Sequence, residues 1–265
     1  IFGKNFYLES FFKKNNISAL SHSGFTGKKS NVKSFPWFPD FQELYFPKNF
    51  SKKNLIFRKI NVFFSTIHST KIIVSSNQVQ DDLKKINLNA YNHSTIIKHS
   101  IYLPKKEDLI SLDQLKSKYQ FKKNYFFLPN HYWTHKNHII ILKTINRIKE
   151  KFKCIVISSG YTNDHRNPEN FKKIKDYINE KNLSEFYKIL GIIPFKDVIS
   201  LMINSLALIN PSKSEGWSNT VEQAKSLGIK ILLSDIKVHR EQANNNCIFF
   251  NPDDEKKLGE LLLNL

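Results

Sequence analysis

The sequence predicts an α/β fold in which parallel strands are covered by helices on both faces. Short apolar runs alternate with longer segments whose apolar residues recur at helical spacing, most regularly from residue 125 onward. The runs are apolar throughout, which is typical of strands buried on both faces of a parallel sheet. Gly191 and Gly228 follow two of the segments, where an element is expected to end.

The second part of the chain predicts a full alternating series of elements. Expected strands cover residues 125–129, 154–158, 186–190, 206–210, 229–234 and 247–250. Expected helices cover residues 136–152, 168–181, 194–204, 219–227 and 238–243, with a last helix from residue 253. Ligands of such sheets bind beyond the carboxyl ends of the strands, so a site is expected in the loops that follow them.

The first part of the chain is less regular. Strands are expected at 18–21, 71–75 and 95–98 and a helix at 78–86, whereas the proline- and aromatic-rich stretch 24–50 predicts loops.

Domain boundaries follow from this contrast. We expect a partial Rossmann-like domain at 1–104, a polar linker at 105–120 and a second Rossmann-like domain at 121–265. Because the chain begins with Ile1 and contains one Met, we also expect that residues precede it and that the first domain is incomplete.

Charge and composition narrow the class of partner. The formal net charge is +18, yet only four of the 41 basic residues are arginine, the residue that best reads bases. We therefore expect a solvated lysine-rich surface and no nucleic-acid partner, with attraction to a membrane face or an anionic lipid-linked acceptor as the alternative. No run approaches the roughly 18 apolar residues of a membrane span. Two cysteines in apolar runs suggest a reducing, cytoplasmic location.

Residues 211–242 carry the most informative motif. A strand ends at Asn210, and Gly216 in the loop that follows lets the backbone approach a ligand closely. Ser218 or Asn219 is expected to cap the next helix, whose first N–H groups form an oxygen or anion site. Two carboxylates flank this helix start, Glu215 before it and Glu222 one turn into it. Each ionised carboxylate accepts several hydrogen bonds, which suits a hydroxyl-rich ligand.

This stretch resembles the paired-glutamate motif of the family 4 (group 1) retaining glycosyltransferases, and its EGWS form resembles a mannosyltransferase-like branch. The resemblance implies a GT-B fold, with two Rossmann-like domains facing a cleft. It implies that Glu215 is catalytic and lies by the donor sugar, and that Glu222 binds the ribose. The amides of residues 216–219, which include Gly216, Trp217, Ser218 and Asn219, would face the sugar and phosphates. Six residues separate the two glutamates here, against seven in the common form.

The loop 128–138 predicts the second part of the donor site. In the family an Arg and a Lys of this loop hold the donor diphosphate. Lys136 matches the Lys, but His131 or Asn130 stands where the Arg is expected. His135 and His138 lie three apart, yet no Cys or carboxylate cluster accompanies them, so we expect no metal.

Acceptor-side residues are expected in the first domain. Residues 35–47 resemble an acceptor loop of the same branch, in which Asp40 matches and Trp37 could stack on a sugar, although packing of this loop on the core is an equal alternative. His22 follows a predicted strand and could line the same region.

Together these observations predict a metal-independent enzyme without cofactor that moves a hexose, mannose being one candidate, from a nucleotide-diphospho-sugar donor to a glycan or lipid-linked acceptor. Peripheral association with the inner membrane face would suit that acceptor. No Asp-x-Asp, G-x-G-x-x-G or P-loop motif occurs. The alternatives are a sugar-nucleotide epimerase or phosphorylase of the same fold, and a non-catalytic lysine-rich module that binds anions, nucleic acid or membranes.

Overall fold

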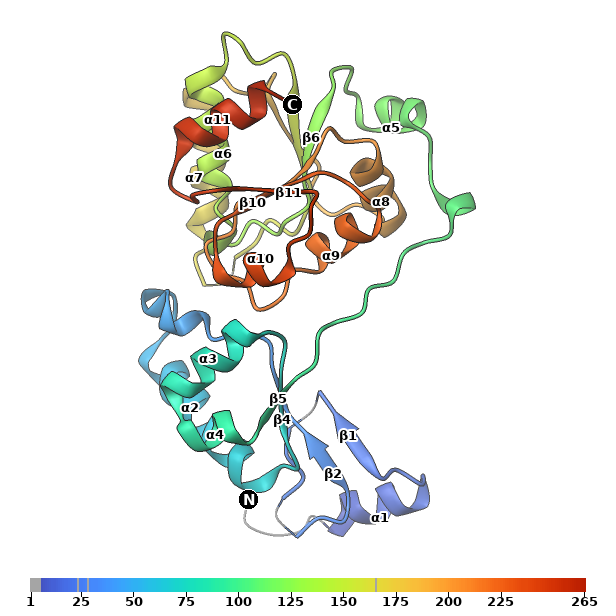
Figure 1. Ribbon diagram of the computed structural model, residues 1–265, viewed down its shortest axis with the longest axis vertical. Coiled ribbons are helices and arrows are strands. Elements are labelled where there is room, and N and C mark those ends of the chain that lie inside the picture. The colour runs from blue at the N-terminus through green and yellow to red at the C-terminus, as the bar shows by residue number, and fades with distance from the viewer. Residues whose placement is uncertain (1–5, 23, 28, 165) are drawn as a thin grey trace. The chain divides into compact units, whose positions relative to one another are not determined.

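The computed structural model describes all residues except 1–5, 23, 28 and 165. The chain divides into two compact units. The first comprises Ile1–His99 with Glu215–Trp217, and the second comprises Ser100–Ser214 with Ser218–Leu265. Figure 1 labels the elements of both.

The second unit is built on a six-stranded sheet in the order β11-β10-β9-β6-β7-β8, and every neighbouring pair is parallel. Its strands are β6 (Tyr125–Leu128), β7 (Ile155–Ser158), β8 (Tyr187–Ile189), β9 (Leu208–Asn210), β10 (Ile231–Ser234) and β11 (Cys247–Phe250). The chain order reverses direction across the sheet between β6 and β9, where crevices beyond the strands commonly hold ligands.

Helices cover both faces of this sheet (Figure 1). Helices α6 (His138–Ile148), α7 (Glu169–Glu180) and α11 (Glu255–Leu263) pack on one face. Helices α5 (Leu112–Tyr119), α8 (Phe195–Ile203) and α9 (Asn219–Ser226) pack on the other, and α10 (Lys237–Gln242) follows β10.

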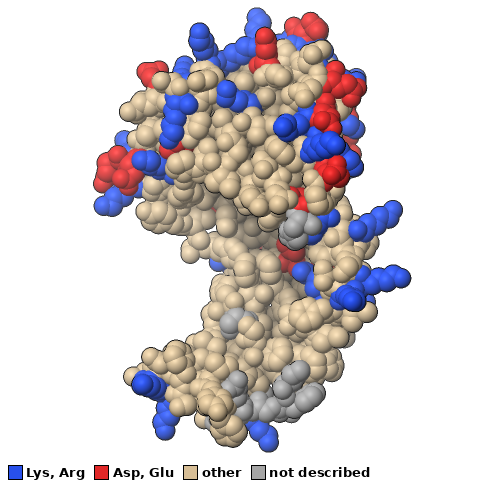
Figure 2. Space-filling model, turned by 180° about the vertical axis from the view of Figure 1, so that it is seen from behind, with Lys and Arg blue, Asp and Glu red and all other residues tan. Residues whose placement is uncertain are grey.

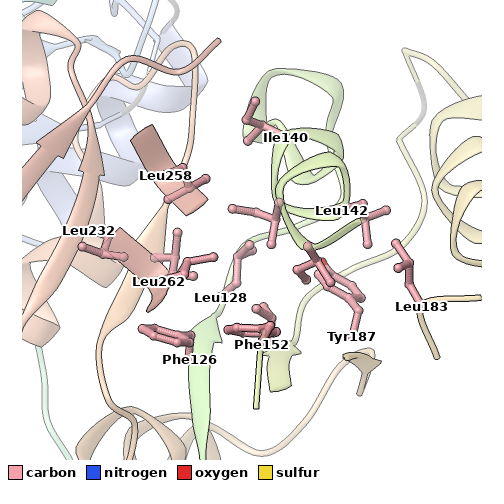
Figure 3. Packing of buried hydrophobic residues seen from close by; sticks show 14 of the residues in the cluster. Phe126, Leu128, Ile140, Leu142, Phe152, Leu183, Tyr187, Leu232, Leu258 and Leu262 are labelled. Carbon is pink, nitrogen blue, oxygen red and sulfur yellow. The ribbon is translucent and has the colours of Figure 1, made fainter. Parts of the chain in front are cut away.

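Strand β6 contributes side chains to both cores because successive residues of a strand point to opposite faces. Phe126 and Leu128 enter one hydrophobic cluster, and Tyr125 and Phe127 enter the other. Figure 3 shows the first cluster, in which side chains of β6, α6 and α11 converge. All four β6 side chains are at most 2% exposed. Burial of this extent stabilises the folded state by about 2 kcal/mol per side chain. It thereby fixes β6 and the start of the loop that follows it.

The elements predicted for the second part of the chain are confirmed, with shifted ends. The helix expected from residue 136 begins at His138, because Asn137 adopts a left-handed conformation with φ of 57°. The linker expected at 105–120 contains η3 (Lys106–Asp108) and α5, which opens with a capping box at Ser111 and buries Leu115 completely. The second unit therefore begins before the predicted linker, since α5 packs on α8.

The first unit has shorter strands. Strand β1 (Ala19–Ser21) pairs with β2 (Lys33–Phe35), and a separate sheet has the order β3-β4-β5, all parallel. Its strands are β3 (Trp37–Phe38), β4 (Ile72–Val74) and β5 (Ser94–Ile96). Its helices are α1 (Phe6–Lys14), α2 (Lys52–His68), α3 (Asn77–Ile86) and α4 (Leu88–Asn92), with 3-10 turns η1 (Gln42–Leu44) and η2 (Pro47–Asn49).

Three strands and one helix predicted for this unit are confirmed. The stretch 24–50, predicted as loop, contains β2 and β3. Helix α2 was not predicted: apolar residues stand on its exposed face as well as its buried one, so no clear helical period appears in its sequence. Among the described residues, no helix is both long and apolar enough to cross a membrane.

On the face drawn in Figure 2, the charged side chains of the second unit are distributed over the surface rather than collected in one patch. On this face its lysine and arginine side chains stand interleaved with acidic ones. This arrangement agrees with the solvated lysine-rich surface expected from composition.

Candidate functional site

A hydrogen-bonded network joins the carboxyl ends of two neighbouring strands of the second unit, β6 and β9. The side chain of Asn210, the last residue of β9, lies at its centre. Its Oδ1 accepts from Asn130 Nδ2 at 3.2 Å and from Ser212 Oγ at 2.7 Å, and its Nδ2 donates to Ser218 Oγ at 3.0 Å. All four residues are buried. The network fixes the loops that follow both strands, because each buried polar group has its partner within it.

Helix α9 begins at the end of this network. Ser218 occupies the N-cap position, as predicted, but its side chain does not cap the helix, because its Oγ is held by Asn210 and lies 3.1 Å from Thr220 Oγ1. Instead Gln242 clamps the Ser218 backbone, accepting from its N–H and donating to its carbonyl, both at 3.1 Å. The Ser218 side chain therefore does not cap the positive end of the α9 dipole.

Glu222 lies one turn into α9, as predicted. Gln242 Nε2 donates to Glu222 Oε1 at 3.1 Å, and Lys225 Nζ lies 3.0 Å and 3.2 Å from its two oxygens. These contacts hold the Glu222 carboxyl group near the start of the helix. Gln242 thus connects the start of α9 with the Glu222 carboxylate. This role of Gln242 was not predicted from the sequence.

Glu215, Gly216 and Trp217 belong to the first compact unit, whereas Ser214 and Ser218 on either side belong to the second. The roles predicted for these three residues stay predictions.

The loop after β6 lies against the loop after β9. The backbone N–H of Lys213 donates to the carbonyl of His135 at 2.8 Å. The Asn137 side chain donates to the carbonyls of Pro211 and Pro252, at 3.1 Å and 2.9 Å. Lys136 sits between these two anchored residues, in the 3-10 turn η4 (Thr134–Lys136) just before α6. The two stretches singled out in the sequence therefore meet at one edge of the sheet.

His131, which with Asn130 was considered for the place of the family arginine, is a neutral group. Its Nδ1 accepts the backbone N–H of Tyr161 at 2.9 Å, which leaves the ring proton on Nε2. Desolvation of the ring and the positive charge of Lys136 both lower the pKa of His131. His131 can therefore donate a hydrogen bond to an anion but brings no charge.

His138 contacts the backbone of the loop after β6 through its buried side chain. It is fully buried, its ring stacks on Tyr132 with centroids 4.1 Å apart, and its nitrogens contact Tyr187 Oη and the His131 carbonyl. Burial lowers the pKa of His138 to about 4. Both nitrogens are engaged, so the pair with His135 is not arranged to bind metal. The described part of the chain contains no group of three or more His, Cys, Asp or Glu that could hold a metal ion.

The loop after β7 contributes residues that were not predicted. Gly160 has φ of +145°, and a Cβ there would lie 2.5 Å from the Asn130 carbonyl oxygen. Asp164 accepts from the N–H and the hydroxyl of Thr134, which ties this loop to the loop after β6. Arg166 stacks on Trp133, with Cζ 5.2 Å from the ring centroid. Arg166 is one of four arginines in the chain and lies in a loop after a predicted strand, a combination that could have singled it out.

In the first unit, two of the predicted acceptor-side residues lie together. The rings of His22 and Trp37 are 5.2 Å apart, and the ring of His99, which was not predicted and lies after β5, is 5.1 Å from that of Trp37. Asp40 instead accepts from Gln42 at 2.8 Å and lies 3.9 Å from Arg58. These contacts support the alternative in which the loop around Asp40 is packed on the core, since Phe38 and Phe41 belong to that core.

Comparison with known proteins decides the family. The family described as "Glycosyl transferases group 1" matches residues 113–265, more than half of the chain. The chain belongs to the group 1 glycosyltransferases. The resemblance seen in the sequence is thereby confirmed.

Individual relatives agree with this assignment. The chain is 23% identical over 230 residues to the O-antigen chain mannosyltransferase RfbU of Salmonella typhimurium, covering 85% of this chain and 59% of RfbU. Its structure is similar to HepE of Anabaena in complex with UDP and glucose, with a TM-score of 0.73 and 15% identity, covering 88% of this chain and 62% of HepE. Sucrose-phosphate synthase from Thermosynechococcus elongatus gives a TM-score of 0.75 at 11% identity, with 96% and 65% covered.

These likenesses confirm the predicted α/β fold class of the GT-B type. This group 1 glycosyltransferase chain spans about 59% of RfbU and 62% of HepE.

Proposed function

We propose that this chain transfers a hexose from a nucleotide-diphospho-sugar and that the carboxyl edge of β6 and β9 binds the donor. The observation that carries the proposal is that three features lie at one edge of the sheet: the start of α9, the carboxylate of Glu222 and the turn that contains Lys136. An anionic diphosphate is stabilised by a helix start and a lysine, and vicinal ribose hydroxyls by a carboxylate.

In this account each group has one task. The α9 amides and Lys136 stabilise the charge that develops on the leaving diphosphate, and His131 adds a hydrogen bond from Nε2–H. Glu222 fixes the ribose, and Glu215 positions the sugar. The acceptor hydroxyl attacks the anomeric carbon as the bond to the diphosphate oxygen breaks, and its proton passes to that departing oxygen. Attack and departure occur on the same face, so that configuration is retained. With the Lys136 ammonium, the helix dipole and a hydrogen bond from His131 at the diphosphate, the proposal includes no metal or other cofactor.

Mannose is the proposed sugar because the relative RfbU is named as a mannosyltransferase. HepE, whose structure contains UDP and glucose, makes glucose the competing candidate. A glycan or lipid-linked saccharide is the proposed acceptor class.

Peripheral membrane contact is proposed together with that acceptor. Helix α2 exposes Ile56, Phe57 and Phe63 by 60%, 69% and 50%, and Lys52 and Lys59 on the same helix are exposed. Apolar side chains interspersed with lysine suit an anionic bilayer surface. Phe57→Ser should reduce co-sedimentation with anionic vesicles, whereas unchanged co-sedimentation would remove this support.

Nucleotide binding tests the donor site first. UDP, GDP and ADP, alone and as hexose conjugates, are added during thermal unfolding. One nucleotide series should raise Tm, because a ligand that binds only the folded state stabilises it by mass action. No shift with any of them contradicts the proposal.

Glu222→Ala then tests the ribose role. The variant should bind the stabilising nucleotide about tenfold or more weakly, since hydrogen bonds to a charged group contribute roughly 1.5–3 kcal/mol. Glu150→Ala, in an exposed position after α6, is the matched control and should bind as the parent does. Product analysis separates transfer from epimerisation or phosphorolysis, and the anomeric configuration of the product tests retention.

A further inference from the structure

We propose that Arg166, from the loop after β7, supplies the guanidinium that the loop after β6 lacks and binds the diphosphate of the donor. This inference rests on the proposed donor site and adds to it a charged residue for which the paired-glutamate motif and the β6 loop give no counterpart.

The side chain at position 131 brings no positive charge to the loop after β6. His131 accepts a backbone N–H through Nδ1 and is therefore neutral, so it offers one hydrogen-bond donor and no charge. Lys136 is then the cation of its own loop. A diphosphate carries about two negative charges, and a planar guanidinium binds phosphate oxygens in a bidentate manner that a lysine cannot reproduce.

Arg166 lies against the loop after β6. Its guanidinium lies 5.2 Å from the Trp133 ring centroid, and the same ring lies 4.9 Å from His131 and 5.7 Å from His135. Arg166 is therefore stacked on the loop that ends in Lys136, although it comes from a neighbouring strand. Its side chain is 17% exposed, so it is partly desolvated and still reachable by a ligand.

Arg166 is held in place by Asp164. Asp164 is 2% exposed and lies 3.6 Å from Arg166 Nε, and its Oδ1 accepts the Arg166 backbone N–H at 3.2 Å. Burial opposes its ionisation, but hydrogen bonds from the N–H groups of Thr134 and Arg166 lower the pKa of Asp164. The carboxylate is shared with Thr134, which ties the arginine to the β6 loop. A guanidinium with a fixed position loses little entropy when it binds an anion.

A purely structural role, in which Arg166 only packs on Trp133, makes a different prediction. It would stabilise the loop and thereby affect every part of the donor equally. Diphosphate binding would affect only ligands that carry phosphate. The ratio of the affinity for a nucleoside diphosphate to that for the matching nucleoside therefore separates the two.

The experiment measures both affinities by calorimetry or ligand-observed NMR for the parent, Arg166→Gln, Arg166→Lys and a control. Arg166→Gln should bind the nucleoside diphosphate at least tenfold more weakly and the nucleoside within twofold of the parent. The affinity of Arg166→Lys for the nucleoside diphosphate should lie between those of the parent and Arg166→Gln, because lysine keeps the positive charge but lacks the planar guanidinium group. The control is Arg147→Gln, an equal loss of charge at the exposed last turn of α6, and it should behave as the parent does.

Each other outcome has a distinct meaning. If the parent binds the nucleoside diphosphate and Arg166→Gln binds it equally well, the inference is overturned and the proposed donor site stands. If Arg166→Gln weakens both ligands equally, Arg166 is a packing residue and the inference is again overturned. If the parent binds no nucleoside diphosphate, the proposed function itself fails.

Discussion

The two units differ in how their strand ends are held. In the second unit, six strands of three or four residues lie between two hydrophobic clusters, and the loops beyond them are joined by buried amide and hydroxyl groups. In the first unit, strands of two or three residues surround one smaller cluster, and the loop around Asp40 is held by a partly exposed arginine. The difference indicates that the loops beyond the strands are held by buried hydrogen bonds in the second unit and, around Asp40, by partly exposed ion pairs in the first.

The largest effect is expected where two loops of the second unit pass closest. Gly160→Ala should lower the free energy of unfolding by about 4 kcal/mol, since its φ of +145° strains any side chain and its Cβ would lie 2.5 Å from a carbonyl oxygen. Gly228→Ala, with φ of +68° and no atom within 4 Å of the added Cβ, should cost only about 1 kcal/mol. Denaturant unfolding measures both. Equal losses would mean that the close approach at Gly160 is unimportant.

A pH dependence is expected from His138 in the second unit. Its pKa is about 4 in the folded protein and about 6.5 when unfolded, so the unfolded chain binds more protons between these values. The free energy of unfolding should therefore fall by about 3 kcal/mol as pH drops from 6.5 to 4, at roughly 1.4 kcal/mol for each unit of pKa. In urea titrations between pH 4 and 6.5, the free energy of unfolding of His138→Gln should depend less on pH than that of the parent. An equal dependence on pH in the variant would show that other groups cause it.

The amide network gives the next effect. Asn210→Ala leaves the buried donors of Asn130 and Ser212 unpaired and should cost about 2 kcal/mol. Its counterpart in the first unit is Gln42→Ala, which removes a contact to the partly exposed Asp40 and should cost about 1 kcal/mol. A larger loss for Gln42→Ala in denaturant unfolding would reverse the comparison between the units.

The smallest effect is expected at Arg58 in the first unit. Its side chain is 34% exposed and lies 2.7 Å from Glu43 and 3.9 Å from Asp40. Arg58→Gln should change the free energy of unfolding by about 1 kcal/mol or less, because solvent screens exposed ion pairs. High salt should reduce the difference further. A loss above 2 kcal/mol would show that this loop is as rigid as those of the second unit.

The same contrast explains what the sequence could predict. The strands of the second unit were predicted because burial on both faces leaves an uninterrupted apolar run, as at β6. The roles of Lys136 and Glu222 were predicted because residues 128–138 and 211–242 resemble motifs of the family. Helix α2 was missed because its exposed face is apolar. The contacts of Asn210, Gln242 and Arg166 were missed because each has a partner distant in the chain: Asn130 lies 80 residues from Asn210, Ser218 lies 24 residues from Gln242, and Arg166 stacks on Trp133 of another loop. Such contacts follow from strand order, which local patterns do not specify.

The most direct test of the donor site is a crystal structure with the nucleoside diphosphate that gives the largest thermal shift. The account predicts the ribose hydroxyls within hydrogen-bond distance of the Glu222 carboxylate, and the diphosphate at the start of α9 with Lys136. A nucleotide bound instead in the cavity of about 570 Å³ beside the amino-terminal ends of β6 and β7, against Lys122, Lys123 and Lys188, would contradict it.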